Sequence, residues 1–255
     1  MAVTDFRSPV RLLEGVKVLD LSILGPGAVA GFLVDLGADV TKIESPAGDY
    51  VRQMTWPIIN DSSLLHWHIN RGKKSITLDM RQAEDRDIAL RLGESADVVV
   101  ENFRPGTMDG WGLGYEAFKA RNPRIIYAQA TGWGTKGAMA TLPSFDQIAQ
   151  AYSGFAQHSG GGPGHRPEVP YPGIADQSGA MNLALGIMTA LFVRERMGIG
   201  QKVEVSLLGT QIALQSPDIL HFLHFGEERA REFRASPTVG HYECADDTGI
   251  MIVAG

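Results

Sequence analysis

Hydrophobic residues recur with two alternating spacings over most of the chain. Short β-branched runs predict strands at residues 16–22, 39–45, 74–80, 97–103, 124–133 and from 201 onward. Helical spacing predicts helices between those strands at residues 28–38, 83–96 and 114–123. Strands that alternate with helices over short connections are typical of a parallel sheet covered by helices. The sequence therefore predicts a doubly wound domain of the α/β class.

The segment after the fifth predicted strand is mostly helical and contains one long loop. Residues 144–155 predict a helix, and the glycines and prolines of "HSGGGPGHRPEVPYPG" (158–173) predict a surface loop. A long apolar helix follows and ends at Gly198. The stretch "QKVEVSLLGTQIALQS" (201–216) begins as a strand and continues as a helix.

The pattern changes near residue 230. The charged stretch "GEERAREFRASP" (226–237) precedes "HYECADDTGIMIVAG" (241–255), which predicts a β-hairpin with "DDTG" at its turn. We therefore expect a large domain over residues 1–229. Residues 230–255 would begin a second, smaller α+β domain, which this sequence leaves incomplete.

Composition narrows the class of protein. Hydrophobic residues make up 44% and charged residues 20%, as in ordinary globular proteins. The net charge of -6 argues against a nucleic-acid or membrane-surface binder, because phosphate affinity requires concentrated lysine and arginine. The longest apolar run, residues 179–193, is shorter than the roughly 20 residues that cross a bilayer. A single cysteine, Cys244, cannot form an internal disulfide, so we expect a reducing, cytoplasmic location.

A short glycine motif follows the first predicted strand. "GPGAVA" (25–30) fits G-x-G-x-x-G/A, and Glu44 ends the next strand near the offset of a dinucleotide fingerprint. Small residues at a helix N-terminus let a phosphate approach free N–H groups. A nicotinamide enzyme and a plain strand-to-helix turn are both open on this motif alone. Tyr115 and Lys119 have the Tyr-x-x-x-Lys spacing, but they lie in the predicted helix at 114–123, and no obvious hydride-transfer constellation accompanies the glycine motif.

One acid stands directly before the long apolar helix. Asp176 lies in "GIADQSGA" (173–180), and the next acid along the chain is Glu195. Aspartate is a favoured N-cap, and a cap contributes about 1 kcal/mol. On pattern alone the cap is the better interpretation, and a catalytic carboxylate is the alternative.

Several segments together resemble one known family, the class III coenzyme A transferases, also called the CaiB/BaiF family. The resemblance rests on "LEGVKVLDLS", "LGADVTKIESPAGD", "KKSITLDM", "DVVVENFRPGTMDGWGLGYE", "NPRIIYAQATGWG", "GIADQSGA" and "RERMGIGQKVEVSLL", which occur in family order. Formyl-CoA transferase, carnitine CoA transferase and α-methylacyl-CoA racemase belong to this family. The resemblance implies a Rossmann-like domain that binds coenzyme A, and two subunits interlocked as a dimer. Family members are usually longer, so a second chain or further sequence would complete the small domain and supply the family's glycine-rich substrate loop.

The resemblance implies that Asp176 is the catalytic nucleophile. Its carboxylate would attack an acyl-CoA thioester and form a mixed anhydride with release of CoA thiolate. The donor acid then leaves as an aspartyl-CoA thioester forms, and a small carboxylic acid accepts the CoA by the reverse steps. The N-terminus of a helix stabilises an anion, so we expect an ionised carboxylate at this position. Acyl-CoA is then a substrate, with no tightly bound cofactor.

The resemblance also implies residues that contact coenzyme A: Ile23, Leu24, Gly25, Leu78, Arg81, Asn102, Phe103, Arg104 and Phe145. Leu78 and Arg81 match positions that hold the adenosine part. Phe103 would pack on the pantetheine arm, and Arg104 would bind phosphate. Two arginines of some family members are replaced by Ser45 and Gly110. The sequence leaves the phosphate ligands open among Lys42, Arg71, Lys73, Lys74, Arg81 and Arg104.

Two other functions remain open within the resemblance. The racemases of the family place a histidine before an aspartate, and the matching dipeptide here is Phe145–Asp146, which lacks the histidine as an acid–base group. His158 and His165 follow in the glycine-rich loop without a spacing that suggests a replacement. The third possibility is a non-catalytic CoA-binding subunit. His66 and His68 have no third ligand at a suitable spacing, so we expect no metal site.

Overall fold

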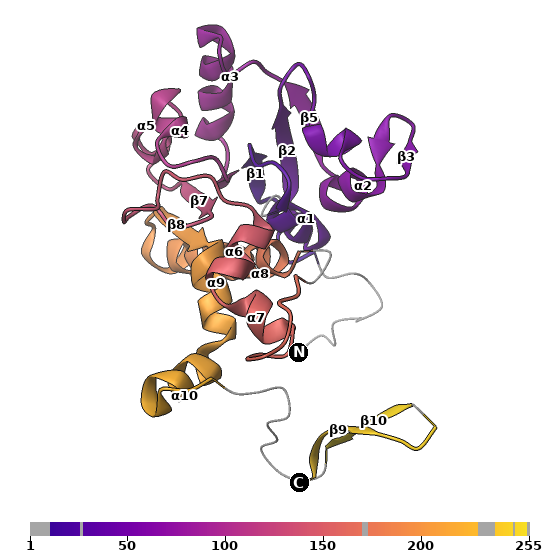
Figure 1. Cartoon of the computed structure of the whole chain (residues 1–255). Coiled ribbons are helices and arrows are strands. Elements are labelled where there is room, and N and C mark those ends of the chain that lie inside the picture. Colours follow the sequence, from indigo (N-terminus) through magenta and orange to yellow (C-terminus); the bar gives the residue numbers. More distant parts are fainter. Residues whose placement is uncertain (1–10, 26–27, 170–172, 229–237, 247, 254–255) are drawn as a thin grey trace, which may run out of the picture.

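The predicted strands form one parallel sheet of six strands in the order β5-β2-β1-β6-β7-β8 (Figure 1). The sheet strands are β1 (Lys17–Asp20), β2 (Asp39–Glu44), β5 (Lys74–Thr77), β6 (Val98–Glu101), β7 (Ile126–Thr131) and β8 (Gln201–Ser206). This is the doubly wound Rossmann order, in which the chain moves outward from β1 in both directions. In this computed structural model the described residues are 11–25, 28–169, 173–228, 238–246 and 248–253.

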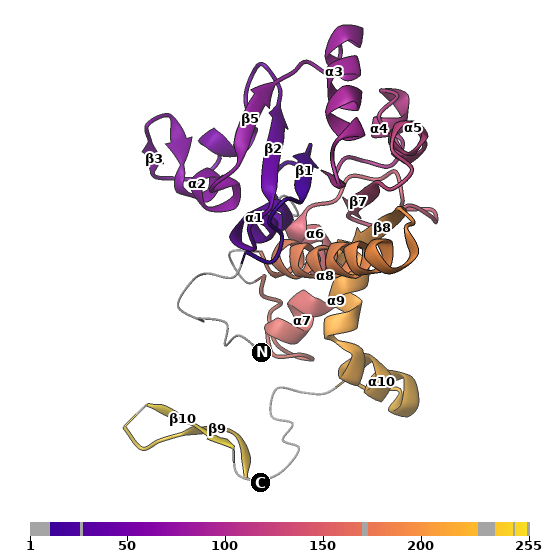
Figure 2. The same ribbon diagram turned by 180° about the vertical axis from the view of Figure 1, so that it is seen from behind.

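Helices cover both faces of the sheet (Figures 1 and 2). The helices longer than one turn are α1 (Ala28–Asp35), α2 (Leu64–Asn70), α3 (Ala83–Glu94), α5 (Tyr115–Arg121), α6 (Asp146–Tyr152), α7 (Phe155–Ser159), α8 (Ile174–Met197), α9 (Leu207–Leu214) and α10 (Ser216–Phe225). The shorter elements are η2 (Tyr50–Gln53), α4 (Thr107–Gly110) and the paired strands β3 (Ile58–Ile59) and β4 (Ser62–Ser63).

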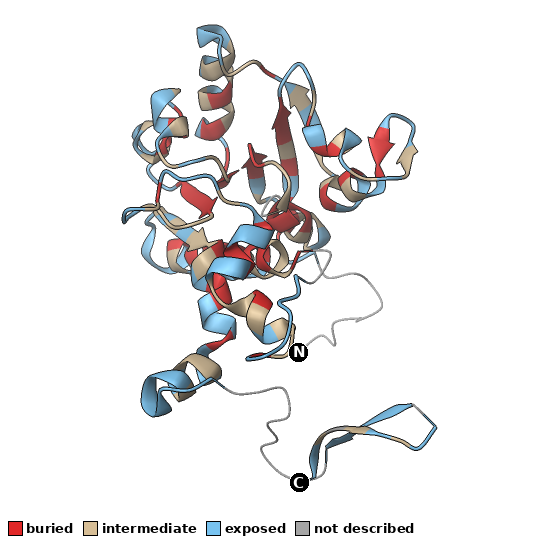
Figure 3. Ribbon diagram, viewed as in Figure 1, coloured by how far each residue is buried: buried red, intermediate tan, exposed pale blue. Residues whose placement is uncertain are grey.

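Alternate residues of each central strand enter two different cores. Val98 and Val100 of β6 pack with α1 and α8, whereas Val99 packs with α3 and α5 on the opposite face. Successive side chains of a strand point to opposite faces, so a sheet buried on both sides needs apolar residues at every position. This explains the unbroken valine run of β6. Figure 3 shows the buried residues concentrated along the sheet and the helix faces that cover it.

Polar side chains gather where the strand order reverses. The loops after β1 and β6 leave the sheet in opposite directions, and in such folds ligands bind at that crevice outside the carboxyl ends of the strands. The long helix α8 points its N-terminus at the same region and packs against α1 and β7. The fold therefore brings together the loop after β1, the loop after β6 and the start of α8.

The C-terminal part contains the predicted hairpin. β9 (Val239–Glu243) pairs antiparallel with β10 (Gly249–Val253), as the sequence predicts. The expected domain boundary near residue 230 and most of the charged stretch at 226–237 lie outside the described residues. The same is true of Pro26 and Gly27 in the first glycine motif. No helix in the described part of the chain is both long enough and apolar enough to cross a membrane.

Candidate active site

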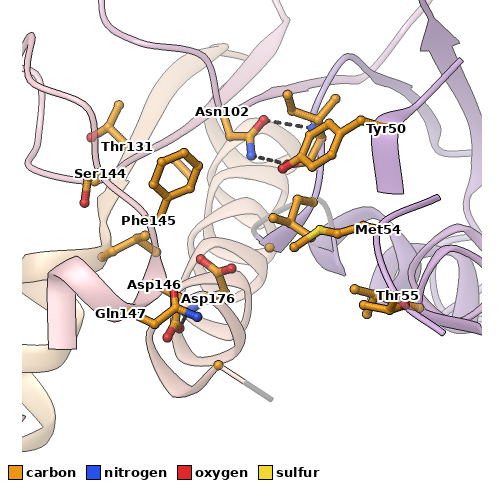
Figure 4. A pocket seen from close by; sticks show the side chains of 18 residues that line it. Tyr50, Met54, Thr55, Asn102, Thr131, Ser144, Phe145, Asp146, Gln147 and Asp176 are labelled. Atoms are coloured by element: carbon orange, nitrogen blue, oxygen red, sulfur yellow. Dashed lines mark hydrogen bonds between the residues drawn. The ribbon is translucent and has the colours of Figure 1, made fainter. Parts of the chain in front are cut away.

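A cavity of about 260 Å³ opens at the crevice between β1 and β6. Its walls come from the loop after β1, η2 and the segment after it, the ends of β6 and β7, the start of α6 and the start of α8. The predicted residues among its lining are Ile23, Leu24, Gly25, Asn102, Phe145 and Asp176. Figure 4 shows Asp176 and Asp146 close together, with Tyr50 and Met54 across from them.

Asp176 is not the N-cap of α8. The helix begins at Ile174, and its N-cap is Gly173, whose backbone is in the left-handed region at φ 109°. Asp176 is therefore the third helical residue, and the cap interpretation is wrong. Its own backbone N–H donates to Asp146 Oδ2 at 2.9 Å. A carboxylate from α6 thus satisfies one of the free N–H groups at the start of α8.

The surroundings of Asp176 disfavour its charged form. Burial and, to a smaller extent, the nearby Asp146 carboxylate together raise the pKa of Asp176 to about 7. The expectation of a carboxylate held ionised by the helix N-terminus is thus contradicted. The helix end favours the anion, but desolvation and a like charge outweigh it. At neutral pH the group is divided between its acid and its carboxylate form, which suits a group that must react as an anion and act near pH 7.

Gly25 contacts the Asp176 carboxyl group directly. A β-carbon at Gly25 would lie 2.6 Å from Oδ1 of Asp176 and closer still to Oδ2. Real side chains do not approach that closely, so any residue but glycine displaces the carboxyl group. Close backbone approach to a reacting group is one of the uses of glycine. The role of Gly25 is therefore to leave space for Asp176 at the cavity wall.

Asn102 holds the loop that carries Gly25. Its Oδ1 accepts the Ile23 N–H at 2.9 Å, and its Nδ2 donates to the Ile23 carbonyl at 2.5 Å, as the dashed lines in Figure 4 mark. The next residue, Leu24, has φ 51°, a left-handed backbone that side chains rarely adopt. The two hydrogen bonds of the Asn102 side chain therefore fix the strained turn at Leu24 and tie the loop after β1 to the loop after β6. Asn102 acts on the loop and lines the cavity at the same time.

A second cavity of about 440 Å³ adjoins the first along the edge of the sheet. Leu78, Arg81, Phe103 and Trp111 are among its lining residues. Ile23 and Tyr50 line both cavities, so the two cavities adjoin at this pair of residues, called the junction below. The predicted adenosine positions, Leu78 and Arg81, thus lie beyond the junction from Asp176.

Phe103 lines the second cavity, and contacts with Trp111 and Glu101 hold it in place. Its ring packs edge-on against Trp111 with centroids 5.1 Å apart. Its backbone N–H donates to Glu101 Oε2 at 2.7 Å, and the Tyr127 hydroxyl donates to Glu101 Oε1 at 3.4 Å. Burial raises the pKa of Glu101 to about 7, against the opposing effect of these hydrogen bonds. Within "VENF", the buried Glu101 therefore holds the backbone of Phe103, while Asn102 and Phe103 line the two cavities.

The structure separates the six basic residues named as phosphate ligands. Lys42 and Lys73 are buried in ion pairs with Asp49 and Asp20, which argues against a phosphate role. Arg71 pairs with Asp35 and Lys74 with Asp39, and neither basic residue lines the two cavities.

Arg81 lines the second cavity, and its side chain is 80% exposed beside Asp79. Arg104 is exposed but is not among the lining residues of either cavity. Arg81 also donates to both carboxylate oxygens of Asp79, at 2.8 and 2.7 Å. Of the six, Lys42 and Arg81 line the second cavity and only Arg81 is exposed there, so the phosphate roles of Arg81 and Arg104 stay predictions.

The acid of the dinucleotide fingerprint is already engaged. Glu44 accepts hydrogen bonds from Arg52 at 2.8 Å, from Ser75 at 2.8 Å and from the Asp49 N–H at 3.0 Å. Although burial opposes it, these donors lower the pKa of Glu44 to about 2. The ribose of a nicotinamide cofactor would have to compete with all of them. The geometry thus disfavours the nicotinamide interpretation of "GPGAVA". Within the described residues no cluster of histidine, cysteine and acid side chains could hold a metal ion.

Two residues of the site escaped the sequence analysis. Asp146 came up only as the partner of Phe145 in the racemase dipeptide, and its contact with Asp176 spans 30 positions of the chain. Tyr50 follows a loop with no regular pattern, and no signal in the sequence marks it. Both are placed by tertiary contacts that local spacing does not encode.

The site and the fold define a class, an α/β protein with a carboxyl group of raised pKa in one of two adjoining cavities at the carboxyl edge of a parallel sheet. The family model for CoA-transferase family III matches residues 13–255. The chain belongs to CoA-transferase family III.

Curated relatives and solved structures agree with this assignment. The chain is 36% identical to a succinyl-CoA:mesaconate CoA-transferase of Haloarcula hispanica, covering 95% of this chain and 64% of the relative. It is 35% identical to an acetyl-CoA:oxalate CoA-transferase of Acetobacter aceti, covering 100% and 66%. A CAIB/BAIF family protein from Brucella suis superposes with a TM-score of 0.85 at 34% identity, covering 95% and 66%. The chain thus spans about two thirds of the length of these proteins.

Proposed function

We propose that this protein transfers coenzyme A from an acyl-CoA donor to a carboxylic acid acceptor, with Asp176 as the covalent nucleophile. The observation that supports this most strongly is the position of the Asp176 carboxyl group, which lies in the cavity with Gly25 against it and no side chain between them. A second cavity adjoins it at Ile23 and Tyr50, and the two together offer room for an extended thioester substrate.

The chemistry follows from the carboxylate. In its ionised form an Asp176 oxygen attacks the thioester carbonyl carbon, the carbon–sulfur bond breaks, and CoA leaves as a thiolate from a mixed anhydride. The thiolate then attacks the aspartyl carbonyl carbon, which releases the donor acid and leaves an aspartyl-CoA thioester. The acceptor carboxylate attacks the carbonyl carbon of that thioester, the carbon–sulfur bond breaks, and a second mixed anhydride forms as CoA thiolate leaves. The thiolate then attacks the acceptor's carbonyl carbon, which gives the new acyl-CoA and frees the Asp176 carboxylate. Covalent catalysis of this kind divides one difficult exchange into easier steps.

The ligand would lie along the carboxyl edge of the sheet. The thioester occupies the cavity at Asp176, the pantetheine arm passes the junction at Ile23 and Tyr50, and the adenosine part reaches Leu78 and Arg81. Phe103 packs on the arm from the side of Trp111. Phe145, which is 58% exposed, lines the same cavity as Asp176 and is available to contact an acyl group.

The two alternative functions fit less well. A two-base racemase needs a second group that accepts and donates a proton, and Phe145 supplies none. A non-catalytic CoA-binding subunit would have no use for a carboxyl group whose pKa is raised to about 7 inside the cavity, because structural carboxylates are normally stabilised as anions. CoA transfer needs no second acid–base group at residue 145 and makes use of the carboxyl group of Asp176 in the cavity.

The identity of the acids and the assembly are part of the proposal. Relatives are named for mesaconate, oxalate and malate, so small carboxylic acids are the acceptors to try first. One relative is named as an alpha subunit, and α10 exposes four large apolar side chains: Leu220, Phe222, Leu223 and Phe225. We propose that the chain associates, as an interlocked homodimer or with a second CoA-transferase chain. The single cysteine supports a cytoplasmic location.

The function is tested by binding and transfer on one preparation. We expect calorimetry to detect CoA and acyl-CoA binding in preference to NAD and NADP. We expect succinyl-CoA or acetyl-CoA to pass CoA to a member of a carboxylic acid panel, and light scattering to find an associated state. Tighter binding of NAD than of CoA would end the proposal. Rapid α-deuterium incorporation into a 2-methylacyl-CoA, at rates rivalling transfer, would favour the racemase, and a fully active stable monomer would contradict the association.

The raised pKa of Asp176 predicts how transfer depends on pH. Because only the carboxylate attacks, kcat/KM should rise with pH through about 7 and then level off. Asp146→Asn removes the neighbouring negative charge, while its amide oxygen can still accept the Asp176 N–H. The pKa of Asp176 should then fall, and the midpoint of the profile should move to lower pH. The measurement is kcat/KM against pH for both proteins.

Asp61→Asn is the matched control for this profile. Asp61 is exposed, lines neither cavity, and has φ 58°, which asparagine adopts readily. Its profile should coincide with that of the native protein. If Asp146→Asn leaves the midpoint unchanged or raises it, the two carboxyl groups are not coupled as their geometry indicates.

A further inference from the structure

One buried ammonium group connects the two sides of the junction. Lys42 Nζ donates to the Ser22 carbonyl at 2.6 Å and lies 3.1 Å from Asp49 Oδ2. Ser22 directly precedes Ile23, and Asp49 directly precedes Tyr50. Ile23 and Tyr50 are the two residues that line both cavities. Lys42 therefore contacts the residue directly before each junction residue. It binds the backbone carbonyl of Ser22, before Ile23, and the side-chain carboxylate of Asp49, before Tyr50.

The charges around Lys42 form a closed, buried group. The side chains of Lys42 and Asp49 are 3% and 1% exposed, and those of Lys73 and Asp20 are 2% and 0% exposed. Asp20 Oδ1 also accepts the Ser22 N–H at 2.9 Å. Although burial alone would raise the pKa of Asp20, Lys73 and Lys42 lower it overall. Two lysines and two aspartates thus compensate one another beneath the loop that leads to Gly25.

The other carboxylate oxygen of Asp49 binds the short helix η2, which carries Tyr50. Asp49 Oδ1 accepts the Val51 N–H at 3.0 Å and so caps η2. Its N–H donates to Glu44 Oε2 at 3.0 Å. The position of Tyr50 therefore follows from Asp49, and the position of Asp49 follows from Lys42.

Stability alone does not account for such a group. Removing two charges from water is costly, and buried ion pairs can often be replaced by apolar residues without loss of stability. We propose that Lys42 is a positioning residue for CoA transfer: it sets the separation of Ile23 and Tyr50, and with it the path of the thioester to Asp176. Lys42 and Asp49 are also among the residues that line the second cavity, but their side chains are only 3% and 1% exposed, so this account gives Lys42 no direct contact with the substrate. It acts through Ser22 on one wall and through Asp49 on the other.

The test is the double variant Lys42→Met/Asp49→Ser. Serine keeps the cap of η2, methionine fills the space of the lysine stem, and the Asp20–Lys73 pair stays balanced. We expect near-native melting with kcat reduced by about 100-fold, the loss that an error of about 1 Å in substrate position can cause. We expect weaker binding of CoA, which spans the junction. Adenosine 3′,5′-bisphosphate, which fills the nucleotide end, should bind as it does to the native protein.

Control and backup variants make every outcome decisive. Lys119→Met/Glu116→Gln removes an exposed pair remote from both cavities and should leave binding and kcat unchanged. If the double variant does not fold, Asp49→Asn is measured instead. Its single acceptor oxygen can serve Val51 or Lys42 but not both, so kcat should fall with the fold retained.

The inference rests on the proposed function for its kinetic readout but not for its binding readout. If the native protein does not transfer CoA, the proposed function fails, and the comparison of CoA with its nucleotide fragment still tests Lys42. A folded Lys42→Met/Asp49→Ser protein with native kcat and native CoA affinity would overturn the inference. Equal weakening of CoA and the fragment would also overturn it, because it would indicate general disruption.

Discussion

Replacing Asp176 with asparagine should abolish CoA transfer while leaving the protein folded. Asparagine has the shape of aspartate but no carboxylate, so no anhydride can form, and kcat should fall by several orders of magnitude. Because Asp176 is the third residue of α8 and not its cap, the substitution removes no capping interaction. Its backbone N–H still donates to Asp146. The measurement is kcat with succinyl-CoA or acetyl-CoA and an accepted acid, beside a melting curve.

The same variant should be more stable than the native protein at alkaline pH. The pKa of Asp176 is raised from 3.8 to about 7 in the folded state, so the folded state binds the proton more tightly than the unfolded state does. Native stability therefore falls as pH rises from about 4 to about 7 and stays reduced above that range. Asparagine carries no such penalty. The melting temperature of Asp176→Asn should exceed that of the native protein at about pH 8, and the gap should close near pH 4.

Asp218→Asn is the control for both measurements. Asp218 is also the third residue of its helix, α10, and lies outside the site. It should keep full activity, and the alkaline gain in stability should be absent. Normal turnover by Asp176→Asn would remove Asp176 as the nucleophile. Loss of folding in that variant would instead indicate a structural role.

Gly25→Ala should also damage catalysis, although less than Asp176→Asn, through the addition of a single methyl group. The backbone at Gly25 is outside the left-handed region, so alanine introduces no backbone strain there. Its β-carbon would stand 2.6 Å from Asp176 Oδ1, and the carboxyl group must move away. A displacement of about 1 Å at a reacting group can cost about 100-fold in rate, which is the loss in kcat that we expect. Binding of CoA should change little, because the proposed binding mode places its nucleotide end in the other cavity.

Gly110→Ala provides the matched control. Gly110 ends α4, has no atom within 4 Å of the position of a β-carbon, and lies outside both cavities. Alanine is favoured over glycine in helices, so this variant should be as stable as the native protein or slightly more stable, with full activity. If Gly25→Ala is as active as the native protein, the contact between Gly25 and Asp176 has no catalytic importance.

The sheet was predictable because its signal is local. Each central strand is a short β-branched run, as in Val98, Val99 and Val100, and each is followed by a helix, so the α/β class followed from spacing alone. The strand ends were less predictable. The predicted strand over 74–80 shortens to β5 because its later residues turn away to line the second cavity. The hairpin near the C-terminus followed from its turn residues.

The site was predictable only where a resemblance marked it. Composition and spacing favoured a cap at Asp176, and only the similarity to a family pointed to a nucleophile. The pKa of Asp176 is raised first by burial and second by Asp146, which the fold brings in from another helix. Lys42 stood in the sequence as one of several cations that could bind phosphate, because spacing does not report burial. Contacts between distant segments decide both cases.

The most direct measurement is chemical trapping at residue 176. Hydroxylamine is added to the active protein together with acyl-CoA, and the peptides are examined by mass spectrometry. An acylated or CoA-linked Asp176 reacts with hydroxylamine to give an aspartyl hydroxamate, whereas a free carboxyl group does not react. We expect the hydroxamate at Asp176, only when acyl-CoA is present, and its absence from Asp176→Asn. Transfer of CoA without any hydroxamate at Asp176, or with one at another acid, would contradict the account.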